Sequence, residues 1–373
     1  MRSGDGAVGV GIIGTGFGRL VHLPSFRLVE EAAVVGVASR TPERARQAAE
    51  AFGLRAFGSW RELVECPEVH AVSVATPPAT HEEIVATACA AGKSVLCEKP
   101  LATDAAQAAR MLRAARAAGI THVMGFEFRE MPAWRFARRL LRRGRVGRLR
   151  HVSVSWLVPS WADPGRGWSW RSDLAQGGGT LGALGVHALD YLEWMLGPVG
   201  AVAAQLTTRV PERPDGTGAW RRVSSEDCCH VLLALRDGTP GTLVVSSVAP
   251  VGSGHWFRCD GDEGVLVVGS ENASDYGKGF GVWLGRRGSD RLRKLRIPAA
   301  LQFAREFEDG RIAPFHRLAR RFVAGVAGKA TGVRPSFAEG ARAQLVLELI
   351  RRADRERRWV EVPPPDVAKE LEA

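Results

Sequence analysis

Residues 8–18 read VGVGIIGTGFG, a short apolar run that ends in a glycine-rich turn. The apolar run, Val8 to Ile13, is typical of a buried parallel strand. Helical periodicity follows from Gly18 to Val29, so the turn joins a strand to a helix. Gly14 permits the tight turn, and Gly16 lets the backbone approach a pyrophosphate at the start of the helix. This order of elements predicts a dinucleotide-binding fold.

The alternation of strands and helices continues through the first third of the chain. Further strands are expected at residues 33–38, 69–75, 94–97 and 121–125, with helices at 43–52, 80–91 and 104–118. Strands that alternate with helices of about ten residues indicate a doubly wound parallel sheet. We therefore expect an α/β Rossmann domain over residues 1–127.

The pattern changes after residue 127. After a helix near 132–143, strands are expected at 149–158, 199–210, 228–235, 241–248, 256–259 and 264–268, helices at 182–195 and 337–355, and loops at 211–222 and 270–290. Consecutive strands joined by glycine-rich turns favour an antiparallel sheet. Because 373 residues exceed the usual size of one core, a second domain is expected over residues 128–373. We expect an α+β domain with a mainly antiparallel, open-faced sheet.

The net charge of +11 raises the question of a nucleic-acid partner. Residues 128–150 hold nine arginines against one acid, Glu130. Five of these arginines recur at helical spacing around Trp134 and Leu140, as on an amphipathic helix with a solvated basic face. No stacking aromatics are interleaved with them as in a single-strand binder. We therefore expect no nucleic-acid partner.

The remaining composition indicates a cytoplasmic protein. None of the six cysteines forms a C-x-x-C pair, and reduced thiols without a metal site are expected. No apolar run approaches the roughly 18 residues that a membrane span needs. The N-terminal residues do not resemble a secretory signal segment. We expect no metal and no membrane partner.

The end of the second expected strand bears on the choice of cofactor. An Asp or Glu at this point would accept a hydrogen bond from a free ribose 2′-hydroxyl and favour NAD. The chain has Ser39 and Arg40 instead. A guanidinium suits a 2′-phosphate, so we expect NADP, with NAD as the alternative. The alternative to a phosphate contact is that Arg40 is a solvated loop residue that stacks beside the adenine.

Two further segments carry groups suited to proton transfer. Glu98 and Lys99 follow a buried strand at its carboxyl end, where open α/β sheets bind ligands. A partly desolvated lysine near a carboxylate can act as an acid or base, although a surface salt bridge is the alternative. Residues 177–190, GGGTLGALGVHALD, place His187 and Asp190 three positions apart on one helix face. We expect Lys99 and His187 to be catalytic, with a structural role for His187 as the alternative.

These motifs together resemble the Gfo/Idh/MocA family of oxidoreductases. The resemblance rests on the G-x-G-x-G turn, Ala75-Thr76-Pro77-Pro78 with His81, Glu98-Lys99-Pro100, Arg129 followed by Pro132, the helix entry Gly177–Asp190, and Glu226-Asp227. It implies that Lys99 and His187 flank a substrate hydroxyl or carbonyl beside the nicotinamide, with His187 moving the proton. It also implies a sugar, polyol or related carbonyl compound as substrate, and an oligomer interface on the second sheet, as a homodimer or homotetramer.

The resemblance also completes the set of expected contacts. Thr76, Pro77 and His81 are implied along the cofactor and Glu98 near the nicotinamide. The expected cofactor site comprises Gly14, Thr15, Gly16, Phe17, Gly18, Ser39, Arg40, Thr76, Pro77, His81, Glu98 and Lys99. The candidate substrate residues are Arg129, Trp168, Arg171 and Asp190, and tryptophans 161 and 170 are further candidates for the pocket wall.

One departure keeps two other functions open. Sugar and inositol dehydrogenases of the family carry Asp four residues before the histidine, and this chain has Ala183 there. One alternative is NAD-dependent glycoside cleavage. The other is a sensor or regulator that binds a dinucleotide without turnover, although a sensor requires neither Lys99 nor His187.

Overall fold

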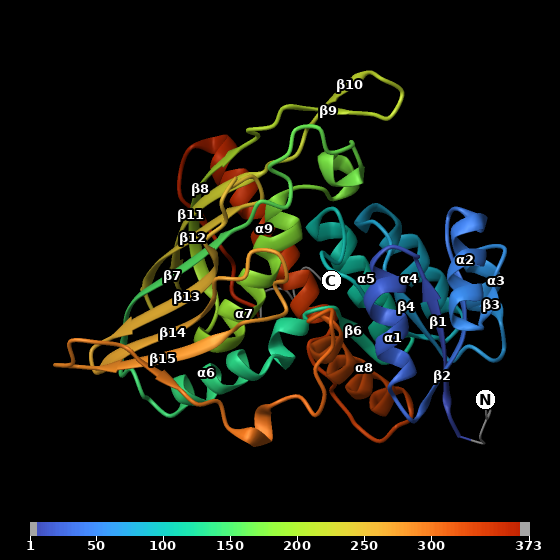
Figure 1. Cartoon of the computed structure of the whole chain (residues 1–373), viewed down its shortest axis with the longest axis horizontal. Helices are drawn as coiled ribbons and strands as arrows, with labels where there is room; N and C mark the ends of the chain where they lie inside the picture. Colours follow the sequence, from blue (N-terminus) through green and yellow to red (C-terminus); the bar gives the residue numbers. More distant parts are fainter. Residues whose placement is uncertain (1–5, 366–373) are drawn as a thin grey trace. The chain divides into compact units, whose positions relative to one another are not determined.

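The computed structural model describes residues 6–365, which form two compact units (Figure 1). The first unit contains the chain up to Glu127 and also Phe307–Gln344. The second contains Phe128–Glu306 and the chain from Leu345 onwards. The expected division into residues 1–127 and 128–373 therefore differs from the observed one by the return of 307–344 to the first unit.

The first unit is built on a six-stranded parallel sheet, as the alternation of strands and helices predicts. Its strand order is β3-β2-β1-β4-β5-β6. The strands are β1 (Val8–Ile13), β2 (Ala32–Ala38), β3 (Arg55–Ala56), β4 (Ala71–Val74), β5 (Ser94–Cys97) and β6 (His122–Met124). The helices after β2 are α2 (Pro42–Phe52), α3 (Trp60–Glu65), α4 (His81–Ala90) and α5 (Ala105–Ala117). Because β2 and β4 flank β1, the order reverses there, and ligands bind at such a reversal.

The return of the chain to the first unit is made by α8 (Ile312–Val326), which the sequence analysis did not predict. Phe315 and Phe322 of this helix are fully buried with Val21 and Phe26 in one apolar cluster. Pro314 interrupts the apolar pattern but lies in the first turn, where proline costs no helical hydrogen bond. The core of the first unit therefore depends on residues about 300 positions apart.

The second unit is an α+β domain, as predicted, around a nine-stranded sheet of order β16-β15-β14-β13-β7-β12-β11-β8-β17. The strands are β7 (Leu149–Leu157), β8 (Val199–Thr207), β11 (Cys228–Leu235), β12 (Pro240–Ser246), β13 (Gly254–Gly261), β14 (Gly264–Ser270), β15 (Gly281–Arg286), β16 (Arg293–Leu295) and β17 (Val360–Glu361). All pairings are antiparallel except that of β12 with β7. The helices are α6 (Pro132–Arg142), α7 (Val186–Leu196) and the second part of α9 (Phe337–Glu356).

Two predicted loops contain strands, so those predictions were wrong. Within 211–222, β9 (Glu212–Pro214) and β10 (Trp220–Arg222) form a separate two-stranded hairpin. Within 270–290, β15 pairs with β14. The hairpin is mostly exposed and lacks an apolar alternation, so its sequence carries no strand signal.

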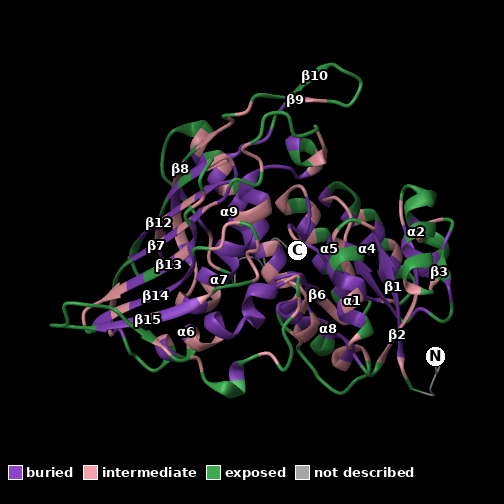
Figure 2. Ribbon diagram, viewed as in Figure 1, coloured by how far each residue is buried: buried purple, intermediate pink, exposed green. Residues whose placement is uncertain are grey.

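Buried residues alternate with more exposed ones along strands such as β11, so the nine-stranded sheet has one buried face and one open face; Figure 2 colours the chain by burial. Along β11, Cys229, Val231 and Leu233 are buried, whereas Leu232 on the other face is 52% exposed. Trp256 and Trp283 pack together on the open face with ring centroids 5.7 Å apart. Helices α6 and α7 lie on the opposite face (Figure 1). Among residues 6–365, no helix combines the length and the hydropathy that crossing a membrane requires.

Candidate active site

The glycine turn after β1 has the geometry that a dinucleotide requires. Gly14 has a φ of +106°, and a Cβ there would lie 2.5 Å from the carbonyl oxygen of Ala75 at the end of β4. Only glycine fits this position without displacing the backbone. Gly16 is exposed, and a Cβ added there would meet no atom within 4 Å. The open backbone at Gly16 therefore forms a cradle that fits a pyrophosphate.

The ends of β1 and β2 are linked beside this turn. The Thr15 hydroxyl donates a hydrogen bond to Ser39 Oγ over 3.1 Å. Ser39 is half-buried and Arg40 is exposed. The structure therefore brings Thr15 and Ser39 together and leaves Arg40 exposed; contact of Arg40 with the cofactor stays a prediction.

His81 joins the Thr76 turn to the segment that follows Lys99. Its buried ring places Nε2 at 2.9 Å from the Thr76 carbonyl oxygen and Nδ1 at 3.1 Å from the Leu101 carbonyl oxygen. Burial lowers the pKa of His81, because the charged imidazolium is poorly solvated there. Both partners are backbone carbonyls, and the neutral ring can donate to one of them at a time, so it links the two loops by one hydrogen bond and one close contact. A direct contact of His81 with the cofactor stays a prediction.

Glu98 and Lys99 lie at the carboxyl end of β5, two strands from β1. Glu98 is 7% exposed, and its Oε2 accepts the backbone N–H of Lys99 over 3.2 Å. A Cβ at Gly125 would lie 2.5 Å from Glu98 Oε1, so the carboxylate packs directly on the backbone of the neighbouring loop. Lys99 is half-buried, and its peptide bond to Pro100 is cis.

His187 is the second residue of α7, which follows a π-helical turn at Leu181–Gly185. The imidazole is 2% exposed, and its centroid lies 4.9 Å from that of Phe128. A second buried histidine in this unit, His255, stacks on Trp156 at 4.0 Å. Burial lowers the pKa of His255 to about 3, so that ring is neutral near pH 7 and serves as a core residue.

Two of the candidate substrate residues bind each other. Arg129 Nε donates to Asp190 Oδ2 over 2.8 Å, and Arg129 Nη2 donates to Oδ1 over 2.7 Å. Their side chains are 8% and 2% exposed, so this is a buried bidentate ion pair. The pair fixes α7, which carries His187, to the segment before α6. Contact of either residue with substrate stays a prediction.

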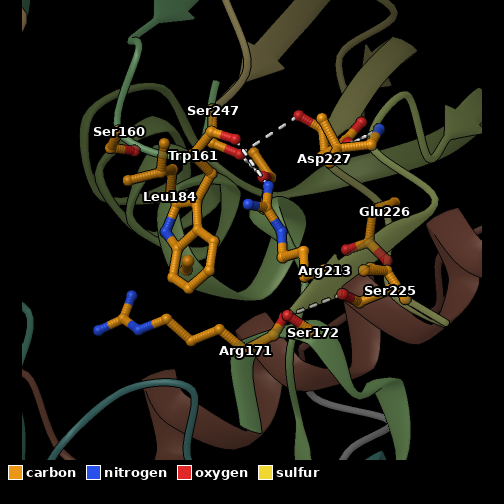
Figure 3. Close-up of a pocket in the computed structure, with 15 residues that line it drawn as sticks. Ser160, Trp161, Arg171, Ser172, Leu184, Arg213, Ser225, Glu226, Asp227 and Ser247 are labelled. Carbon is orange, nitrogen blue, oxygen red and sulfur yellow. Dashed lines mark hydrogen bonds between the residues drawn. The ribbon is translucent and has the colours of Figure 1, made fainter. Parts of the chain in front are cut away.

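A pocket opens in the second unit beside the π-helical turn (Figure 3). Its empty volume, including space open to solvent, is about 480 Å³. The lining residues are Ser160, Trp161, Arg171, Ser172, Gly179, Thr180, Ala183, Leu184, Val210, Arg213, Val223, Ser225, Glu226, Asp227 and Ser247. Arg171 is therefore a lining residue, as is Ala183, where dehydrogenases of the family carry Asp.

The other candidate substrate residues are not part of this lining. Trp168 instead contacts the hairpin: its indole N–H donates to the Arg222 carbonyl oxygen over 3.2 Å, and the Arg221 guanidinium lies 3.5 Å from its ring centroid. Arg129 and Asp190 form the ion pair described above. Of the two further tryptophans, Trp161 lines the pocket and Trp170 does not.

The pocket is lined by an indole ring and several polar groups. The guanidinium groups of Arg166 and Arg213 lie over the Trp161 ring, 4.2 Å and 4.9 Å from its centroid, so the chain itself already stacks on this indole. The hydroxyls of Thr180 and Ser247 lie 2.5 Å apart. Hydroxyl and guanidinium groups can form hydrogen bonds to a polar ligand such as a sugar.

The two carboxylates of the pocket, Glu226 and Asp227, already have hydrogen-bond partners within the protein. Glu226 Oε1 accepts the Leu181 N–H over 3.1 Å and pairs with Arg351 at 3.2 Å. The Asp227 carboxylate accepts the backbone N–H groups of Arg209 and Val210, at 2.8 Å and 2.9 Å. The carboxylates of Glu226 and Asp227 therefore stabilise the loops that line the pocket. In the sequence, Glu226-Asp227 was noted only as part of the family motif, with no structural role assigned to it.

Comparison with known proteins extends these observations. Residues 8–126 match the family model described as "Oxidoreductase family, NAD-binding Rossmann fold". Residues 134–267 match that of the "GFO/IDH/MocA C-terminal domain". An uncharacterised oxidoreductase of Synechocystis sp. is 37% identical over 360 residues, which cover 96% of each chain.

Levoglucosan dehydrogenase of Pseudarthrobacter phenanthrenivorans is 29% identical, over 95% of this chain and 98% of that protein. A solved structure of levoglucosan dehydrogenase in complex with NADH has a TM-score of 0.86 at 28% identity. It covers 96% of this chain and 100% of that one. A second, in complex with NADH and L-sorbose, has a TM-score of 0.85.

Proposed function

Because the chain belongs to the Gfo/Idh/MocA oxidoreductase family, we propose that it interconverts an alcohol and a carbonyl group on a sugar, polyol or related compound. The observation that carries this proposal is the placement of two motifs on one sheet. The glycine turn follows β1, and Glu98-Lys99 follows β5, which lies beyond β4 on the other side of the reversal in strand order. The carboxyl ends of parallel strands meet at one edge, where ligands bind.

Each candidate residue has a distinct role in the proposed reaction. When bound, the nicotinamide cofactor accepts or donates the hydride. Lys99 Nζ donates a hydrogen bond to the substrate oxygen and so stabilises the charge that develops there. A ring nitrogen of His187 takes up the hydroxyl proton in oxidation and returns it in reduction.

The pocket around Trp161 supports a ring-shaped polar substrate. Its hydroxyls from Thr180 and Ser247 and its guanidinium from Arg171 are hydrogen-bonding groups that suit a carbohydrate. The similarity to levoglucosan dehydrogenase supports the same class. Purified protein should therefore oxidise at least one compound in a panel of anhydrosugars, aldoses and polyols, followed by the absorbance of the reduced nicotinamide. No turnover in either direction, with the cofactor still bound, would contradict the proposal.

We propose NADP as the preferred cofactor because Ser39 and Arg40 stand where an acid would favour NAD. Arg40→Ala should weaken NADPH binding by about 10-fold to 100-fold, because hydrogen bonds to a charged phosphate are lost. NADH binding should change by less than about threefold, since NADH lacks that phosphate. Arg61→Ala, another exposed arginine of the first unit, is the matched control. Tighter binding of NADH than of NADPH by the wild-type protein would refute this preference.

The open face of the nine-stranded sheet is proposed to bind a second copy of the chain, giving a homodimer or homotetramer. Leu232, Val244, Trp256 and Trp283 gather on this face, and exposed apolar patches mark interaction sites.

Leu232→Lys should therefore shift the protein toward monomer, as measured by light scattering after gel filtration. The ammonium group of the new lysine would lose its water in the interface, which makes association less favourable. Leu174→Lys, which alters a leucine that is 38% exposed outside the sheet, is the control. A wild-type monomer at micromolar concentration would contradict the interface.

A further inference from the structure

Three buried side chains connect the interior of the parallel sheet to the Lys99 segment. Ser73 on β4 places its Oγ 2.8 Å from His22 Nδ1. His22 Nε2 lies 3.1 Å from Glu98 Oε1. Ser73 and His22 are fully buried, and Glu98 is 7% exposed. The chain of contacts ends at Glu98 Oε2, which accepts the Lys99 N–H.

The chemistry of the partners fixes the direction of these hydrogen bonds. A carboxylate only accepts, so His22 Nε2 carries the proton that is donated to Glu98. In the tautomer that carries its proton only on Nε2, Nδ1 accepts a hydrogen bond from the Ser73 hydroxyl. The carboxylate thereby selects the tautomer, and the Ser73 hydroxyl, which can donate or accept, is compatible with it.

Aromatic packing fixes the orientation of the His22 ring. The ring stacks on Phe315 of α8, with centroids 4.1 Å apart and planes inclined by 25°. Phe17, within the glycine turn, meets its edge at 5.4 Å. Contacts at one face and one edge restrict the rotation of the ring and so favour one direction of Nε2, toward Glu98.

We propose that His22 is a positioning residue, which acts on Lys99 through Glu98. By holding Oε1, the His22 N–H orients the carboxylate so that Oε2 anchors the backbone of Lys99. This places the start of the Lys99 side chain at the strand end. The inference rests on the proposed catalytic role of Lys99.

Several titratable groups surround Glu98. His22 faces it from the helix after the glycine turn, and Lys99 and Cys97 adjoin it in the chain. His81 acts on it electrostatically from α4. The proposal concerns the orientation of the Glu98 carboxylate and not its titration. The variants are therefore compared at one fixed pH, so that changes in the charge of these neighbours do not enter the comparison.

Two amide substitutions at His22 separate positioning from packing. Gln places its amide near Nε2 and can still donate to Glu98, whereas Asn places its amide near Nδ1 and reaches only Ser73. His22→Asn should lower kcat by about 10-fold to 100-fold with less than about threefold change in KM, and His22→Gln should stay within about threefold of wild type. Glu98→Gln should lower kcat similarly, and adding it to His22→Asn should cause little further loss.

Hydrogen exchange at the Lys99 amide gives a readout that needs no turnover. In His22→Asn its protection should fall at least about tenfold, because its acceptor is no longer held, while His22→Gln keeps it. His316→Asn, which alters the neighbour of Phe315 that bonds to the Ser25 carbonyl, is the control. Equal effects of Asn and Gln at position 22, or none from either, would overturn the assignment. A different outcome is that Lys99→Ala keeps full turnover, while the amide at position 99 loses protection in His22→Asn and keeps it in His22→Gln. The proposed catalytic role of Lys99 would then be wrong, but the hydrogen bond from Glu98 to this backbone amide would be supported.

Discussion

Replacing Lys99 with alanine is expected to lower kcat by about 10²-fold to 10⁴-fold, the range typical of a lost proton-transfer or charge-stabilising group. Lys99 is one of the expected cofactor contacts, but the glycine turn and Ser39-Arg40 are unchanged in this variant, so most of the cofactor affinity should be retained. Turnover is measured by the absorbance of the reduced nicotinamide, and binding by its fluorescence. The cause is the loss of Nζ at the end of β5.

Lys93→Ala is the matched control for this experiment. Lys93 is also half-buried in the first unit, but its Nζ donates to the Val69 and Cys66 carbonyls, at 2.7 Å and 3.3 Å. It should keep kcat within about threefold of wild type. Unimpaired turnover by the Lys99 variant would remove that residue from the mechanism. Tight cofactor binding without turnover by the wild-type chain would instead favour a sensor.

Replacing Arg129 with leucine is expected to destabilise the protein by about 3–5 kcal/mol. The substitution leaves the Asp190 carboxylate buried without its bidentate partner. Such a charge either stays poorly solvated or must be protonated, and both outcomes favour the unfolded state. The free energy of unfolding is measured by denaturant titration.

The double variant Arg129→Leu/Asp190→Leu tests the cause. It removes both charges and should recover much of the stability lost in the single variant. Arg258→Leu, which breaks an ion pair whose side chains are 46% and 25% exposed, should cost less than about 1 kcal/mol. A loss below that level for Arg129→Leu would show that solvent reaches Asp190 freely.

The sequence predicted those parts of the fold that bury continuous apolar runs. Strands such as Val8–Ile13 and Ser94–Cys97 are buried at every position, so their composition alone indicates them. By contrast, β3 consists of two exposed residues, and β9 and β10 alternate weakly, so nothing in their composition separates them from loops. α8 was missed although Phe315, Phe322 and Val323 recur at helical spacing, so its local periodicity could have indicated the helix; its packing on the first unit could not be read locally.

The residues of the candidate site also fall into two groups: those indicated by local sequence motifs and those brought together only by the fold. The glycine turn, Glu98-Lys99 and the His187 helix are local motifs, so their sequence spacing indicates chemistry. Contact of Arg129 and Asp190 with substrate stays a prediction, and their ion pair was not predicted. Their pairing joins residues 61 positions apart, which local spacing does not reveal. Thr180 and Ser247 likewise meet only in the folded chain.

The contribution of α8 to the first unit has a consequence for biosynthesis. Translation runs from the N-terminus, and domains usually fold in that order as they leave the ribosome. Here the partners of Val21 and Phe26 in α8 emerge only after residues 128–306 of the other unit have been made. The nascent first unit must therefore wait with an unfinished core, and a fragment ending at Glu127 would leave His22 without the ring of Phe315.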